Sequence, residues 1–169
     1  AVKTSPPSYG GSFSSCRQYR EDFSRILDGT EYDGVVTIDK IRPFFDHPGF
    51  VQAFVEGVHD AVRQRLDEGL AADQIQVLFS THSIPMDDAV RSGPRDIDWG
   101  EGGAYAVQHQ AVSAWVMARV AELTPAAADV PWELVYQSRS GPASQPWLEP
   151  DVCDVIGELP QRGRRAVGV

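Results

Sequence analysis

Short apolar runs alternate with longer amphipathic segments along the chain. The runs GVVTID (34–39), QIQVLFST (74–81) and WELVYQS (132–138) are rich in β-branched and aromatic residues. Runs of this length and composition, bounded by turn-forming residues, are typical of buried strands. The final run RAVGV (165–169) predicts the start of a fourth strand.

The segments between these runs have the periodicity of helices. From Phe50 to Leu66, apolar residues recur at i, i+3, i+4 and i+7, which places them on one helix face. Another helix is expected from about residue 104 to residue 123. Its apolar face should contain Tyr105, Val112, Trp115, Val116 and Leu123.

Two shorter helices and one long loop complete the pattern. Ser14 or Ser15 can cap a helix that ends near Leu27, and a short helix is predicted at 151–159. Residues 86–103 have no sustained period and are rich in Asp, Gly, Arg and Pro. A long irregular segment directly after a strand is often a functional loop, although its first turn can be helical.

This alternation predicts an α/β fold with a parallel sheet flanked by helices. Strands that are joined through helical crossovers run in the same direction, and the crossover helices cover both faces of the sheet. The sequence has neither GxGxxG nor GxxxxGK[ST]. The usual fingerprints of nucleotide-binding α/β domains are therefore missing.

Composition and charge exclude several classes of protein. Hydrophobic residues make up 42% of the 169 residues, which is enough for a packed core. The net charge of −9 repels phosphate backbones, so we expect no nucleic-acid partner. No apolar run reaches the about 20 residues of a spanning helix, and the N-terminus lacks a signal-peptide core. We therefore expect a soluble, cytoplasmic protein without an integral membrane segment.

Cysteines and termini add two expectations. Cys16 and Cys153 are far apart and form no CxxC pair, so by themselves they indicate buried or incidental thiols. The chain stops inside the apolar run 165–169, which is unusual for the end of a domain. We therefore expect a fragment of a longer protein.

Polar side chains follow the predicted strands at their carboxyl ends, where open parallel sheets bind ligands. Asp39 and Lys40 follow the first strand, and His82 and Ser83 follow the second. The third strand is followed by Gln137, Ser138, Arg139 and Ser140. Three strand ends should therefore present an imidazole, hydroxyls, an amide and a cation at one edge of the sheet, which we call the rim.

Two interpretations of His82 remain open on residues alone. It can be a structural histidine that is hydrogen-bonded at a strand end. It can also accept a proton or bind a borderline metal near neutral pH, oriented by the neighbouring hydroxyls. The other histidines, His47, His59 and His109, are interpreted as structural. No GxSxG motif supports a serine nucleophile.

Four stretches in order along the chain resemble motifs of the ferrochelatases, which insert ferrous iron into porphyrins. FSTHSIP resembles the family's Ser-x-His-Ser-[Leu/Ile]-Pro pattern, and YQSRSGPASQPWLEPD resembles its Gln-Ser-x-x-Gly-Pro…Pro-Trp-Leu-x-Pro pattern. SYGGSFSSCRQYRE and IRPFFDHPGFVQAF resemble two further segments. The Cys-Arg-Gln-Tyr variant is similar to a Gram-positive branch that carries a [2Fe–2S] cluster and metallates coproporphyrin III.

The resemblance implies two Rossmann-like chelatase domains with the macrocycle between them. Residues 1–32 would be the end of the first domain, and 33–169 most of the second, truncated at its C-terminal end. His82 takes the position of the family's active-site histidine, as an iron ligand or a proton acceptor. The implied substrate-binding residues are Ser5, Tyr9, Phe13, Ser83, Gln137 and Ser138.

The resemblance also implies what this chain lacks. The family's essential glutamate follows the strand that begins with RAVGV, and it lies beyond Val169. Cys16 matches one cluster ligand, while the other ligands come from a Cys-rich tail that is absent. The implied cofactors are Fe²⁺ as substrate and a [2Fe–2S] cluster in the full-length protein. We also expect a monomer. The fragment by itself is expected to be inactive.

Alternatives from other classes are kept beside this hypothesis. A non-catalytic porphyrin- or haem-binding module would need the same aromatic rim without a catalytic base. A nucleotide-binding domain would need a phosphate loop that the sequence does not show. The substrate itself is left as coproporphyrin III or protoporphyrin IX.

Overall fold

A computed structural model describes residues 18–39, 41–142 and 144–169 of the chain. Its centre is a parallel sheet in the order β2–β1–β3. The strands are β1 (Ile75–His82), β2 (Trp132–Gln137) and β3 (Ala166–Gly168). The predicted parallel α/β fold is therefore confirmed, and the three later strand predictions hold to within about one residue at most ends.

Strand β1 is the central strand of the sheet. It pairs with β2 from Val77 to His82, whereas β3 pairs only with its first residues, Ile75–Val77. The carboxyl ends of β1 and β2 therefore lie side by side, with His82 opposite Gln137. This register brings two of the expected polar strand ends together.

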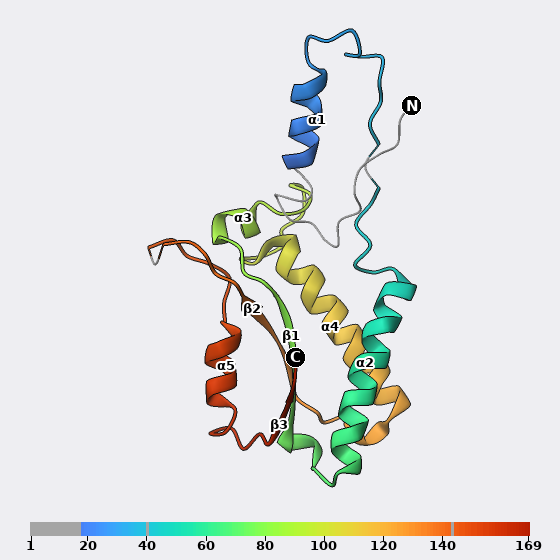
Figure 1. Cartoon of the computed structure of the whole chain (residues 1–169), viewed down its shortest axis with the longest axis vertical. Helices are drawn as coiled ribbons and strands as arrows, with labels where there is room; N and C mark the ends of the chain where they lie inside the picture. Colours follow the sequence, from blue (N-terminus) through green and yellow to red (C-terminus); the bar gives the residue numbers. More distant parts are fainter. Residues whose placement is uncertain (1–17, 40, 143) are drawn as a thin grey trace.

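Two long helices cover one face of the sheet (Figure 1). They are α2 (Pro48–Asp67) and α4 (Gly103–Leu123), which pack against each other and against β1. The periodicity of residues 50–66 and 104–123 predicted both. The N-terminus of α2 is capped by His47, whose ring accepts a hydrogen bond from the Gly49 amide, and Pro48 is the first helical residue.

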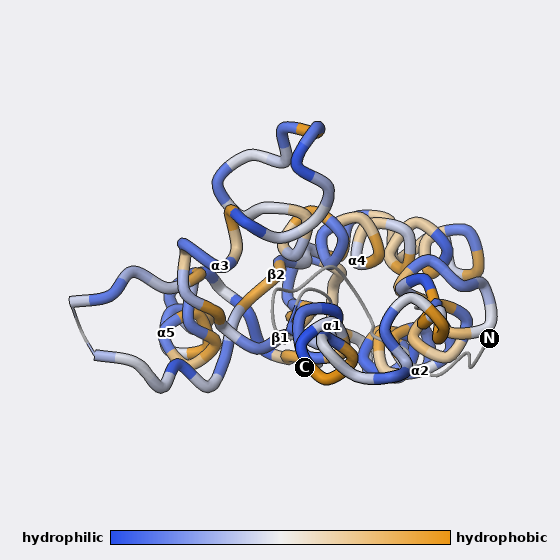
Figure 2. The backbone as a smooth tube through the Cα atoms, turned by 90° about the horizontal axis from the view of Figure 1, so that it is seen from above, coloured by the Kyte–Doolittle hydropathy of each residue, from blue (hydrophilic) through white to orange (hydrophobic). Residues whose placement is uncertain are grey.

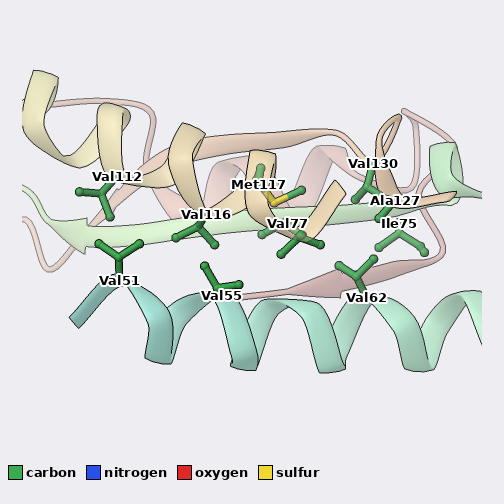
Figure 3. Packing of buried hydrophobic residues seen from close by; sticks show 11 residues of the cluster. Val51, Val55, Val62, Ile75, Val77, Val112, Val116, Met117, Ala127 and Val130 are labelled. Carbon is green, nitrogen blue, oxygen red and sulfur yellow. The ribbon is translucent and has the colours of Figure 1, made fainter. Parts of the chain in front are cut away.

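The main core lies between these helices and β1. Its valines are almost completely buried, with Val55 and Val62 at 2% exposure and Val116 at 0%. Figure 3 shows the α2 side chains Val51, Val55 and Val62 pointing toward Val112, Val116 and Met117 of α4, alongside Ile75 and Val77 of β1.

A second core lies on the opposite face of the sheet. Leu78 of β1 and Val135 of β2 pack there against Val155 and Leu159, at helix α5 (Val152–Glu158). Asp151 caps α5 by accepting a hydrogen bond from the Cys153 amide at 2.8 Å. Side chains alternate between the faces of a strand, so Val77 and Leu78 belong to different cores.

The remaining helices are short or separate from the cores. Helix α1 (Tyr19–Leu27) has no buried residue and lies apart from the sheet (Figure 1). It ends at Leu27 as predicted, and its proposed caps lie outside the described residues. Single 3₁₀ turns occur at Ala72–Gln74 and Pro125–Ala127. Among the described residues, no helix is long and apolar enough to cross a membrane.

The segment after β1 confirms the expected loop. Helix α3 (Met86–Val90) forms its first turns, and the chain then runs without regular helix to α4. Figure 2 shows this stretch as an outward loop in mainly hydrophilic colours.

The strand prediction at 34–39 is wrong. Residues 31–35 form turns, Ile38 makes one isolated bridge, and Val35 is 74% exposed. Amides of Val35 and Val36 donate to the Tyr32 carbonyl, and Gly34 has a φ of 72°, so the chain bends where the strand was expected to begin. β-Branched residues favour a strand only where a neighbouring strand completes the pairing.

The predicted apolar face of α4 is correct for Tyr105, Val112 and Val116, which are buried. It is wrong for Trp115 and Leu123, which are 40% and 53% exposed. These two residues lie outside the stripe that α2 and β1 cover, since helix periodicity alone does not fix how wide that stripe is.

Candidate active site

The carboxyl ends of β1 and β2 form the rim that the sequence predicted. His82 is the last residue of β1, and its side chain is exposed. Gln137 and Ser138 at the end of β2 are exposed as well. An imidazole, an amide and a hydroxyl therefore stand on neighbouring strand ends and are open to solvent.

Residues 34–39, which were predicted to be a strand, do not contribute a third strand end to this rim. Asp39 is exposed and follows the isolated bridge at Ile38 rather than a strand, and Lys40 lies outside the described residues. The expectation of three adjoining strand ends therefore reduces to two.

Ser83 is placed differently from His82. It is only 3% exposed, and its hydroxyl donates to the Leu148 carbonyl at 2.8 Å. Its amide donates to the Gln137 carbonyl at 2.7 Å. Ser83 therefore joins the end of β1 both to β2 and to the loop that follows β2.

That loop, residues 138–150, is held against the end of β1. The Leu148 amide donates to the Ile84 carbonyl, and the Met86 amide donates to the Pro146 carbonyl, both at 3.0 Å. Pro85 and Trp147 form an antiparallel bridge between the two segments. The resemblance-bearing stretches FSTHSIP and YQSRSGPASQPWLEPD are thus brought together in space.

Two backbone features shape the loop. Ser138 has a φ of 62°, in the left-handed region that non-glycine residues seldom adopt. At Gly141, an added Cβ would lie 2.5 Å from the Trp147 ring, so only glycine allows this close approach. The Trp147 indole Nε1 is buried and finds no hydrogen-bond partner among the described residues. The aromatic ring is therefore fixed by packing.

A hydrogen-bonded cluster beneath the rim was missed by sequence reasoning. The Tyr105 hydroxyl donates to the His82 carbonyl at 2.9 Å. It also lies 2.9 Å from Thr81 Oγ1, which in turn lies 3.0 Å from His109 Nε2. His109 Nδ1 lies 2.7 Å from the Tyr105 carbonyl. We call Thr81, Tyr105 and His109 the rim-support cluster.

Burial changes the acid–base properties of this cluster. It lowers the pKa of His109, although the adjacent Tyr105 carbonyl acts in the opposite direction. It raises the pKa of Tyr105, which the Thr81 hydroxyl partly offsets. When the His109 ring is neutral, Thr81, Tyr105 and His109 each have one proton to donate. The cluster makes the four contacts given above, so one of them lacks a hydrogen-bonding proton.

A signal for this cluster was present in the sequence but ambiguous. Tyr105 and His109 are four residues apart on a predicted helix, which places them on one face. Thr81 has the same parity along β1 as Val77 and Phe79, which predicts the same side of the sheet. Only the packing of α4 on β1 shows that these faces meet.

The cluster borders a cavity of about 940 Å³ beside β1. Its walls come from α2, β1, α4 and β3 and are mainly apolar. Thr81 and His109 line it together with Ser80 and Ser113. The cavity thus reaches from the end of β3 to the residues beneath the rim.

The other candidate residues are not brought to the rim. His47 caps α2, and His59 Nε2 lies 3.0 Å from Thr124 Oγ1, so both are structural as predicted. Cys153 is an exposed free cysteine in α5. Ser5, Tyr9, Phe13 and Cys16 lie outside the described residues. Within the ranges described, no three His, Cys, Asp or Glu side chains form a group that could hold a metal.

Comparison with known proteins gives a consistent result. A family profile described as Ferrochelatase matches residues 5–169. The coproporphyrin III ferrochelatase of Leifsonia xyli is 53% identical over 175 residues, which cover 99% of this chain and 43% of that protein. That of Tropheryma whipplei is 48% identical over 155 residues, covering 92% and 39%. That of Streptomyces coelicolor is 44% identical over 160 residues, covering 94% and 40%. The chain therefore spans about two fifths of the length of these curated relatives.

Proposed function

Since this chain belongs to the ferrochelatase family, we propose that it contributes His82 to a site that inserts ferrous iron into a porphyrin during haem biosynthesis. The observation that carries the proposal is the exposure of His82 at the carboxyl end of the central strand. The peptide that follows it is anchored on both sides, so the imidazole is presented to solvent on a rigid support.

The chemistry requires a group of this kind. Two pyrrole N–H protons must leave the macrocycle for each Fe²⁺ that enters. An exposed imidazole can accept one proton at a time and release it to water, or it can hold the incoming iron as a nitrogen ligand. Either role places His82 next to the porphyrin nitrogens.

We propose coproporphyrin III as the substrate, because the compared relatives bear that name. Gln137 and Ser138, exposed beside His82, are suited to contact the polar edge of the macrocycle. Ser83 would contribute indirectly, since its hydroxyl holds Leu148 of the loop. Ser5, Tyr9 and Phe13 are proposed to contact the porphyrin, because the resemblance places them in the segment that lines the porphyrin cleft.

Three further parts complete the proposal. A cytoplasmic location follows from the sequence patterns given above, a monomer is expected, and the resemblance alone supports Cys16 as one ligand of a [2Fe–2S] cluster. The described residues supply no group that could provide the other ligands of the cluster. Their cysteine, Cys153, lies on α5 outside any group of potential metal ligands. Iron and sulfide analysis of the natural protein, with a Cys16→Ser variant, tests the cluster.

The test measures metalloporphyrin formation from Fe²⁺ with coproporphyrin III or protoporphyrin IX. It uses this chain and, in parallel, the longest natural protein that contains it. We expect His82→Ala to lower turnover by a factor of about 100 or more, because the group that meets the metal or the proton is gone. His47→Asn is the matched control, since it removes another exposed histidine but keeps a good N-cap for α2.

Three outcomes decide between the functions. Loss of turnover in His82→Ala with normal turnover in His47→Asn supports the proposal. Near-normal turnover in His82→Ala overturns the role of His82. Porphyrin binding, followed at the Soret band, without any turnover in either protein favours a non-catalytic porphyrin-binding module.

A further inference from the structure

The orientation of one peptide plane sets the direction in which the His82 side chain leaves the backbone. The amide between His82 and Ser83 donates through its N–H to the Gln137 carbonyl of β2 at 2.7 Å. Because a trans peptide directs its N–H and C=O to opposite sides, the His82 carbonyl points away from β2. Among the described residues, β3 pairs with β1 at Ile75–Val77.

The Tyr105 hydroxyl of α4 meets this carbonyl. It donates to the His82 carbonyl at 2.9 Å. The peptide is thereby fixed at both ends, and with it the backbone torsion that directs the His82 side chain. The Tyr105 hydroxyl has the geometry to orient the imidazole without touching it.

Tyr105 is itself firmly held. It is 8% exposed, and its amide donates to Ser92 Oγ at 2.9 Å. Its hydroxyl lies 2.9 Å from Thr81 Oγ1, and its ring is 4.5 Å from the His109 ring. The hydroxyl therefore has a defined place before any ligand arrives.

We propose that Tyr105 is a positioning residue for His82, with Thr81 and His109 holding its hydroxyl in place. The proposal rests on the function proposed above. The proposal predicts different effects on rate and on binding. Because the Tyr105 hydroxyl lies beneath the rim, porphyrin affinity should not depend on it. The placement of the His82 imidazole, and with it the rate, should depend on it. Small misplacements of a reacting group cost large factors in rate.

The test introduces Tyr105→Phe into whichever of the two proteins above shows metallation. The substitution removes one oxygen and keeps the ring. We expect kcat to fall by about tenfold, with KM for the porphyrin within about twofold of wild type. Ser113→Ala is the matched control. It removes a 2.9 Å hydrogen bond from a buried serine of the same helix, and that bond ends at the His109 carbonyl. Its kcat should stay within about twofold of wild type.

A second variant separates positioning from general stability. Thr81→Val keeps the side-chain shape and removes the hydroxyl that meets Tyr105, so we expect an intermediate fall in kcat of about threefold. The double variant with Tyr105→Phe should be no slower than Tyr105→Phe alone, because both act through the same oxygen. Should Tyr105→Phe fail to fold, Thr81→Val carries the test.

A spectroscopic readout does not require turnover. The His82 ring resonance, assigned with His82→Ala, should move in Tyr105→Phe and remain in place in Ser113→Ala. Wild-type metallation together with unchanged kcat in Tyr105→Phe would overturn the positioning role and leave the proposed function intact. Absence of wild-type metallation would remove both. Additive effects in the double variant would also contradict the proposal.

Discussion

Three side chains beneath the rim illustrate how individual residues acquire properties from their surroundings. His109 lies in a helix, yet its two ring nitrogens contact Thr81 Oγ1 and the Tyr105 carbonyl. Burial favours its neutral form and therefore lowers its pKa. Protonation would complete the fourth hydrogen bond of the cluster, but it would place a charge in a poorly hydrated site. The lowered pKa indicates that desolvation is the larger effect.

This lowered pKa links the stability of the protein to pH. Unfolded histidine titrates near its ordinary value of 6.5, above the folded value, so the unfolded state binds the proton first as pH falls. The stability that neutral His109 contributes is fully present above about pH 6.5, and it is lost as the pH falls through the pKa of His109 in the folded protein.

We therefore expect the free energy of unfolding to fall as the pH drops below about 6.5, and to fall less in His109→Gln, which can still bond to Thr81 without titrating. Urea unfolding at several pH values measures this difference. Equal pH dependence in the two proteins would show that His109 does not titrate differently on folding.

At the scale of elements, the start of α4 determines where Tyr105 stands. Gly103 has a φ of 61°, and an added Cβ would lie 1.6 Å from the Ala89 carbonyl oxygen and 2.5 Å from Ser92 Oγ. The same Ser92 hydroxyl accepts from the Tyr105 amide and donates to the Ala89 carbonyl. Helices α3 and α4 are thus joined by a close backbone approach that only glycine permits.

Gly103→Ala should accordingly destabilise the protein by about 2 kcal/mol or more, because both the backbone conformation and the contact become unfavourable. Gly57→Ala is the control: Gly57 lies inside α2 with nothing within 4 Å of an added Cβ. That change should stabilise by about 0.5–1 kcal/mol through helix propensity. Denaturant melts of the two variants give the comparison, and a harmless Gly103→Ala would contradict the close approach.

At the scale of the whole molecule, strand β1 connects two cores and the site. Val77 belongs to the core under α2 and α4, while Leu78 belongs to the core under α5. The same strand ends at His82, so both cores restrain the residue at the rim. A rigid strand of this kind keeps a functional side chain in place far better than a loop would.

Leu78→Ala should therefore reduce the free energy of unfolding by about 2–5 kcal/mol, since Leu78 is 2% exposed and its removal leaves a cavity. Leu123→Ala provides a matched change at the end of α4, where the side chain is 53% exposed. That variant should lie within about 0.5 kcal/mol of wild type. Similar losses in both would show that the α5 core is not closed.

The sequence by itself determined the elements and their order. Periodicity located α2 and α4, and apolar runs located β1, β2 and β3, because each element needs one face that excludes water. A short helix was also expected where α5 lies. The rule for parallel sheets then placed His82 at the edge of the sheet where ligands bind. The same reasoning failed at 34–39, where composition favoured a strand but the described chain turns at 31–35 and Ile38 makes an isolated bridge.

Only the tertiary structure decided which side chains at that edge are available. It turned the Ser83 hydroxyl inward to Leu148 and left His82 exposed. It also brought Tyr105 from α4 to the His82 carbonyl, across 23 positions of sequence. Sequence periodicity reports which face of an element is apolar. The partner that meets a given polar atom depends on how separate elements pack, and no single element encodes that.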